Sequence, residues 1–190
     1  MSVAFTALWT QDVCRPLRKG FVGRRPPVVF SGAHGSSVGW GSVDTGDEVF
    51  ALHVSKCVIH VVSRLRVLDW KQSACCGALP AFWADPAYQG HPGWDDALGA
   101  GRCGAAPVHV DATPIRFDVT VPGDLLPTLT WRNAKGVTRT PKHVVDGRLT
   151  NSMSIQGVYR LTEGSAADLS ALIDAAPPLP AVGGEARAVA

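Results

Sequence analysis

The sequence lacks any run of about 18 apolar residues, so we expect no membrane-spanning helix. Its start is also a poor match to a secretion signal, so we expect none: no basic residue precedes the apolar part, and the polar Gln11 and Asp12 come shortly after Trp9. The five cysteines are odd in number, and Cys75 and Cys76 are adjacent. Together these features predict reduced thiols and a cytoplasmic protein.

Signatures of metal and phosphate chemistry are missing as well. Structural zinc sites favour Cys-x₂₋₄-Cys or His-x₃₋₅-His pairs, and none is present, so we expect buried or loop thiols, no zinc and no cofactor. The glycine-rich stretch 31–37 lacks the Lys-Ser/Thr of a P-loop. The Gly-x-Ser-x-Gly motif of serine hydrolases is absent. A catalytic triad of a cysteine with His143 and Asp146 stays open as an alternative, because triads are defined by geometry and not by spacing in the sequence.

The composition is that of a globular chain, with 46% apolar and 18% charged residues in 190. This length fits one domain, which we place at 1–175. The stretch 70–106 is rich in aromatics, proline and glycine and predicts a long irregular insertion. Residues 176–190 have no periodicity and predict a disordered tail.

The strongest local pattern is a β-hairpin over 48–68, entered through the Gly46-Asp47 turn. Ser55-Lys56 supplies a connection of hairpin length. The second strand alternates, which predicts one buried face and one more polar face. The expected buried face holds Ile59, Val61, Leu65 and Val67, and the opposite face holds Arg64 and Arg66.

Other segments predict further strands and one helix. Residues 10–25 are expected to be a basic connection without regular structure. The helix has Thr162 or Ser165 as its cap and Leu169, Leu172 and Ile173 as its apolar stripe. The remaining expected strands are 3–9, 28–30, 108–110, 115–121, 129–132 and 154–162.

Charge is unevenly distributed along the chain, although the net charge is only +2. Charge runs are usually solvated surface, but two basic regions that flank an acidic middle modestly favour an anionic partner. The first basic region is Arg15, Arg18, Lys19, Arg24 and Arg25. The second is Arg132, Lys135, Arg139, Lys142 and Arg148.

Six tryptophans are present, of which Trp9 and Trp131 fall in expected strands and are assigned to the core. The others fall in expected loops, where they either pack the insertion onto the domain or form a cage that stacks on a planar ligand or a flipped base. These loop tryptophans are Trp40, Trp70, Trp83 and Trp94.

The order of these signals resembles the PUA-like superfamily, whose members include EVE, ASCH and YTH domains. The resemblance rests on an aromatic first strand, Phe5 to Trp9, and on a Gly-Asp turn into a hairpin, Gly46 through Val67. It extends more loosely over 108–173. It implies a small β-barrel that binds RNA or modified bases. The Gly-x-Lys-x-x-Glu-x-Arg signature of ASCH domains is absent, which argues against a nuclease or hydrolase of that branch.

We therefore predict an α+β fold: a β-rich, PUA-like small barrel with a long loop insertion and a C-terminal helix. The leading hypothesis is a nucleic-acid-binding module that recognises a modified or flipped base through an aromatic cage with basic flanks. The alternatives are a small enzyme using His34, His60 or His143 on an anionic or planar metabolite, and a structural protein whose long loop binds a partner. The expected nucleic-acid contacts are Arg15, Arg18, Lys19, Arg24, Arg25, Trp40, Trp83 and Trp94.

Overall fold

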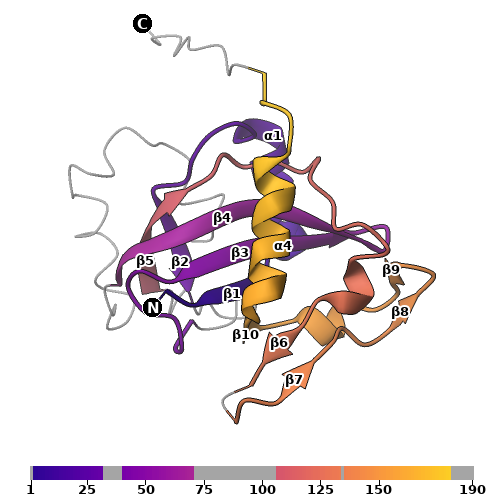
Figure 1. Ribbon diagram of the computed structural model, residues 1–190. Helices are drawn as coiled ribbons and strands as arrows, with labels where there is room; N and C mark the ends of the chain where they lie inside the picture. Colours follow the sequence, from indigo (N-terminus) through magenta and orange to yellow (C-terminus); the bar gives the residue numbers. More distant parts are fainter. Residues whose placement is uncertain (1, 32–39, 71–105, 134, 181–190) are drawn as a thin grey trace, which may run out of the picture.

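The computed structural model describes residues 2–31, 40–70, 106–133 and 135–180. Within them a mixed six-stranded sheet lies between two α-helices, so the fold is α+β, as predicted (Figure 1). Its strands, in the spatial order β10-β1-β3-β4-β5-β2, are β1 (Ala4–Leu8), β2 (Val28–Ser31), β3 (Glu48–Ser55), β4 (Val58–Trp70), β5 (Ala106–Ala112) and β10 (Val158–Arg160). The helices are α1 (Gln11–Gly20) and α4 (Glu163–Asp174).

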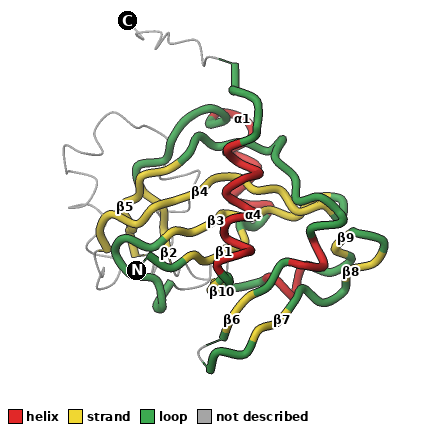
Figure 2. Tube along the Cα trace, in the orientation of Figure 1, coloured by secondary structure: helices red, strands yellow, loops and turns green. Residues whose placement is uncertain are grey.

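The segment between β5 and β10 adds two small antiparallel ribbons, one below the sheet and the other to its right in Figure 2. One ribbon pairs β6 (Trp131–Arg132) with β7 (Thr138–Arg139), and the other pairs β8 (Val144–Val145) with β9 (Arg148–Leu149). Two short 3₁₀ helices, Leu126–Thr128 and Ser152–Ile155, complete this segment.

The central hairpin is confirmed: β3 and β4 pair antiparallel. Its turn lies one residue later than predicted, because Ser55 still pairs with Val58 and the two turn residues are Lys56 and Cys57. Both have positive φ, 50° and 64°, as in a type I′ turn. That turn type matches the right-handed twist of the flanking strands.

A β-bulge interrupts this hairpin. Ala51 pairs with Ser63 and Leu52 pairs with Val61, so Val62 is an extra residue in β4. An extra residue on one strand reverses which face the following side chains occupy.

The bulge makes one prediction wrong: the four expected core residues of β4 do not share a face. Ile59 and Val61 pack in the cluster that contains Leu169 of α4, whereas Leu65 and Val67 pack in the cluster that contains Leu17 of α1. The strand is therefore buried on both faces and not on one, and Arg64 and Arg66 lie on the α4 side.

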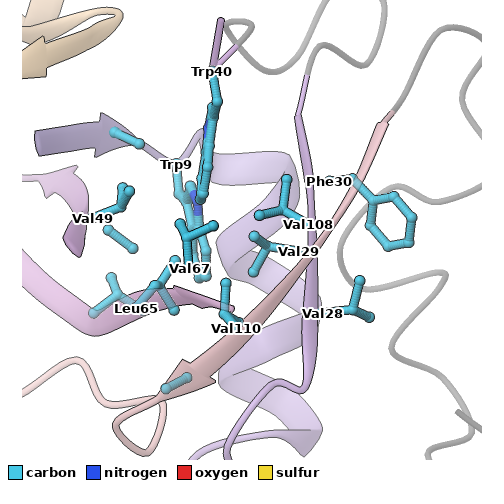
Figure 3. Close-up of a cluster of buried hydrophobic side chains, with 14 of the residues drawn as sticks. Trp9, Val28, Val29, Phe30, Trp40, Val49, Leu65, Val67, Val108 and Val110 are labelled. Carbon is cyan, nitrogen blue, oxygen red and sulfur yellow. The ribbon is translucent and has the colours of Figure 1, made fainter. Parts of the chain in front are cut away.

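Residues 10–25 are also corrected, since they include α1, although Pro16 lies within it. Cys14 and Leu17, three residues apart, are buried against the sheet, while Arg15, Arg18 and Lys19 are exposed. This amphipathic spacing offsets the backbone hydrogen bond that proline cannot make. Figure 3 shows the adjoining core, where Trp9 and Trp40 lie beside Val67.

The sheet is not closed into a barrel, so the small barrel is not confirmed. Strands β10 and β2 lie at its two edges. The predicted strand 115–121 does not form as a regular strand. It is represented by an isolated β-bridge between Thr120 and His60, beside which the Val61 amide donates to the Val119 carbonyl at 2.9 Å. The predicted 154–162 strand is shortened to β10, because a 3₁₀ helix precedes it.

The C-terminal helix is confirmed, with the Thr162 hydroxyl accepting from the Ser165 amide at its start. Beyond it, the Pro177 carbonyl accepts a hydrogen bond of 3.0 Å from Arg116 Nη2, so the expected tail is held against the domain at its beginning. Most of the predicted 70–106 insertion, and residues 181–190 of the predicted tail, lie outside the described residues.

A buried hydrogen bond anchors β6 to the sheet. Trp131 is 1% exposed, and its indole Nε1–H donates to Thr6 Oγ1 of β1 at 2.8 Å. Both groups are removed from water, so loss of either one leaves the other without a hydrogen-bond partner.

We expect Trp131→Phe and Thr6→Val each to lower the free energy of unfolding by about 1–3 kcal/mol. The double variant should lose less stability than the sum of the two single losses, because it contains no buried polar group without a partner. Urea unfolding of the four proteins measures this coupling. Strict additivity would show that the hydrogen bond is not what anchors the indole.

Candidate functional site

Segment 131–160, here called the basic segment, concentrates positive charge. It contains six Lys and Arg residues and one acid, Asp146, whereas the whole chain has a net charge of +2, so the rest of the chain is net negative. All six cationic side chains are exposed: Arg132, Lys135, Arg139, Lys142, Arg148 and Arg160. This is the second basic region of the sequence, extended by Arg160.

Tight turns hold the basic segment in place. In the β6–β7 ribbon, Asn133 Oδ1 accepts from the amides of Lys135 and Val137, both at 2.9 Å. In the β8–β9 ribbon, Asp146 and Gly147 have positive φ, 48° and 68°. These turns present the cationic side chains on short, twisted ribbons.

The basic segment also exposes apolar side chains. Of the large apolar residues exposed in the described ranges, Val137, Val145 and Met153 belong to it, at 60%, 55% and 67% exposure. Exposed apolar groups among cations add contact area for a partner.

An open groove of about 630 Å³ lies where the basic segment meets the sheet edge. We call it the edge groove. Its floor consists of Val3, Phe5 and Val158, on the sheet face that α1 covers further along. The polar side chains of its lining are Ser42, Asp44, Thr45, Asp47, Arg132, Asn133, Tyr159 and Arg160.

The acidic wall of the groove belongs to the turn before β3. The Asp47 carboxylate accepts from the amide of Val3 at 2.9 Å through Oδ1 and from the amide of Asp44 at 2.9 Å through Oδ2. Asp47 is only 7% exposed, so it serves mainly to fix this turn against β1. The Asp44 side chain is exposed beside it.

The basic wall is organised around Tyr159. The Arg139 guanidinium carbon lies 3.8 Å from the centre of the Tyr159 ring, a cation–π contact. The Tyr159 hydroxyl donates to the Gln156 carbonyl at 2.5 Å. Gly157 has φ of +134°, and a Cβ placed there would lie 2.9 Å from the ring. One face of the ring is thus occupied by Arg139.

The predicted contacts on α1 form a separate surface. Arg15 and Lys19 are exposed, and the Arg18 guanidinium carbon lies 4.2 Å from the Phe117 ring centre. In Figure 1 α1 lies at the top, the β6–β7 ribbon at the bottom and the β8–β9 ribbon at the lower right, so the two basic regions of the sequence are not brought together.

Arg24 and Arg25, the other predicted cations, lie beyond α1. Arg24 is exposed, with its guanidinium carbon 5.6 Å from the Phe21 ring centre. Arg25 Nη1 donates to the Ala112 carbonyl at 2.9 Å and borders a smaller cavity of about 240 Å³ that Arg64 and Arg66 also line.

The predicted aromatic cage is not assembled by the described residues. Trp40 is 3% exposed and packs in the core, so it presents almost no ring surface to a base. Trp83 and Trp94 lie outside the described residues, as does His34. The aromatic residues that line the edge groove are Phe5 and Tyr159, and no pattern in the sequence pointed to Tyr159 as a site residue.

A pair of histidines, His53 buried and His60 half-buried, lies on the α1 side. The ring centres of His53 and His60 are 6.2 Å apart. Nδ1–H of His53 donates to the Trp9 carbonyl at 3.2 Å, and Nδ1–H of His60 donates to the Phe117 carbonyl at 2.8 Å. Burial lowers the pKa of both imidazoles, and the hydrogen bonds to these carbonyls offset this lowering only in part. Both rings therefore favour the neutral form more than a free imidazole does.

Thiol chemistry finds little support in the described residues. Cys14 is fully buried, and burial raises the pKa of its thiol to about 12. A thiol that stays protonated is a poor nucleophile and a poor metal ligand. Cys57 is exposed in the β3–β4 turn. No group of three or more potential metal ligands occurs in the described ranges.

The helices in the described part of the chain are too short or too polar to cross a membrane. No protein-family model matches the sequence, and a search of curated proteins finds no match.

We expect Gly157→Ala to destabilise the protein by about 1–3 kcal/mol, because alanine disfavours this backbone region and its Cβ would meet the Tyr159 ring. Gly164→Ala is the matched control, since nothing lies within 4 Å of a Cβ there and the residue is in α4. That control should stabilise the helix. Urea midpoints measure both, and equal effects would contradict the contact argument.

Acidification should destabilise the fold through His53 and His60. Their folded pKa values lie below the unfolded value of about 6.5, so the unfolded chain binds more protons and stability rises with pH. The loss begins as pH falls through about 6.5 and continues toward the lower folded pKa values. Urea unfolding from pH 7.5 to 5 should show a steeper loss in wild type than in His53→Gln/His60→Gln. Identical slopes would contradict this assignment.

Proposed function

We propose that this protein is a nucleic-acid-binding module whose basic segment contacts the phosphate backbone. The observation that carries the proposal is charge segregation: six exposed cations and one acid lie within 131–160 of a chain whose remainder is net negative. Such a one-sided field attracts a polyanion and orients it on approach.

The geometry of the ribbons supports a polymer as the ligand. The six cations are spread over β6 to β10 and their connections, and the exposed Val137, Val145 and Met153 lie along the same segment. A polymer with repeating phosphates and apolar base faces uses both kinds of contact.

Two finer expectations remain part of this proposal. One is the PUA-like small barrel, supported by the order of β1, the Gly46–Asp47 turn and the β3–β4 hairpin. The other is recognition of a modified or flipped base, for which the edge groove now takes the place of the tryptophan cage. A cytoplasmic location is proposed with them.

The α1 surface is a competing backbone-contact site, so the test compares the two surfaces directly. Lys135→Gln/Arg148→Gln removes two charges from the basic segment, and Arg15→Gln/Lys19→Gln removes two from α1. All four side chains are exposed, and none makes a hydrogen bond or ion pair within the described residues. Fluorescence anisotropy with labelled single-stranded and duplex DNA and RNA, at several salt concentrations, gives affinity and salt slope.

Wild type should bind more weakly as salt rises, and the basic-segment variant should lose about 1.4 in salt slope on a single strand, or about 1.8 on a duplex. The α1 variant should stay close to wild type. Salt-independent binding, or no binding at low salt, would sink the proposal. Loss confined to the α1 variant would move the interface to Arg15 and Lys19.

A further inference from the structure

We propose that the edge groove is a nucleotide-recognition pocket with a preference for guanine, in which Asp44 accepts from the base and Arg132 and Arg160 hold the phosphate. This inference rests on the proposed function, because it assigns the base-reading step to a specific part of the same surface. It adds a ligand class that the charge of the basic segment alone does not give.

The groove has the dimensions of a small-molecule site. Its volume of about 630 Å³ lies within the range of about 300–1,000 Å³ that is common for ligand pockets. Its floor is apolar, formed by Val3 and Phe5 of the β1 region and by Val158 of β10. An apolar floor beneath polar walls suits a planar heterocycle.

Charge is segregated across the groove by the strand order. Asp44 and Asp47 precede β3, Arg160 is on β10, and β1 lies between those two strands. Two strand spacings separate β3 from β10 by about 10 Å. Arg132 lies further out on β6, which bridges to the end of β10 through Trp131 and Leu161. A ligand that spans the groove therefore meets carboxylate at one end and guanidinium at the other.

At the acidic end, Asp44 is the carboxylate left for a ligand. Both Asp47 oxygens accept backbone amides. The Asp44 side chain, by contrast, makes no hydrogen bond or ion pair with the described part of the chain. An ionised carboxylate only accepts hydrogen bonds, and its two oxygens suit two adjacent N–H donors.

Guanine offers such a pair on its base-pairing edge, N1–H beside the N2 amino group. Adenine, cytosine and uracil each place an acceptor beside their donor on that edge, which would face a carboxylate oxygen unfavourably. A site built to pair with donors rejects a base that lacks them. Asp44 therefore favours guanine over the other three bases.

At the basic end, Arg132 and Arg160 are exposed and have no carboxylate within ion-pair distance among the described residues. Guanidinium groups bind phosphate through paired N–H donors. Arg139 lies close by, held on the Tyr159 ring, and adds to the positive field.

Calorimetric titration with GMP, AMP, CMP, UMP and guanosine tests the assignment. Wild type should bind GMP about tenfold or more tightly than AMP. Asp44→Asn should remove that preference by weakening GMP while leaving AMP nearly unchanged. Arg160→Gln should weaken GMP but not guanosine, which has no phosphate.

Matched controls are Asp168→Asn on the exposed side of α4 and Arg15→Gln on α1, which should both behave as wild type. Equal affinity of wild type for GMP and AMP, or an unchanged preference in Asp44→Asn, would overturn the inference. Circular dichroism of each variant checks that the fold is intact.

Failure of this inference is distinguishable from failure of the proposed function. If wild type binds polymers with salt dependence but shows no guanine preference, only the pocket assignment fails. If it binds GMP selectively but no polymer, the pocket stands and the nucleic-acid module does not. In a protein with both properties, Asp44→Asn should retain its affinity for poly(U) and lose its extra affinity for guanine-containing strands.

Discussion

The structure depends on one constraint, the burial of the β3–β4 hairpin on both faces. Phe50 and Ala51 are adjacent in β3, point to opposite sides and are both fully buried. The bulge at Val62 lets β4 serve both layers, since it moves Leu65 and Val67 to the α1 side after Ile59 and Val61 have packed on the α4 side. Two helices are therefore needed to cover the sheet, one on each face.

The position of the edge groove depends on where helix α1 stops covering the sheet. Helix α1 covers the face over the central strands, but it does not extend to the β10 edge, where Val3, Phe5 and Val158 form the floor of an open groove. The buried bond from Trp131 to Thr6 attaches the basic segment beside this edge. The same attachment thus places Arg132 together with Arg160 in the lining of a partly apolar groove, which is why we propose that backbone binding and base recognition share one surface.

Much of the fold could be read from local patterns, because β-branched runs, turn residues and helix caps act over a few residues. The hairpin, β1, β2, β5 and α4 were predicted on these grounds. Helix α1 was missed because Pro16 and five cations suggested a connection, although Cys14 and Leu17 are spaced to bury together. The β8–β9 ribbon was missed too, although Asp146-Gly147 between Val145 and Arg148 is a strong hairpin signal.

The α+β class, the central hairpin and the two basic regions could be predicted before the structure, since these features depend on composition and on neighbours along the chain. Which basic region adjoins the edge groove depends on how distant segments pack. Asp44, Arg132 and Arg160 are far apart in the sequence and meet because β10 pairs with β1 and β1 pairs with β3. Trp40 is a second residue whose environment the local sequence did not predict. Its place in a loop suggested exposure, but packing against Trp9 and Val67 buries it. Long-range pairing and packing set such neighbours, and no local pattern encodes them.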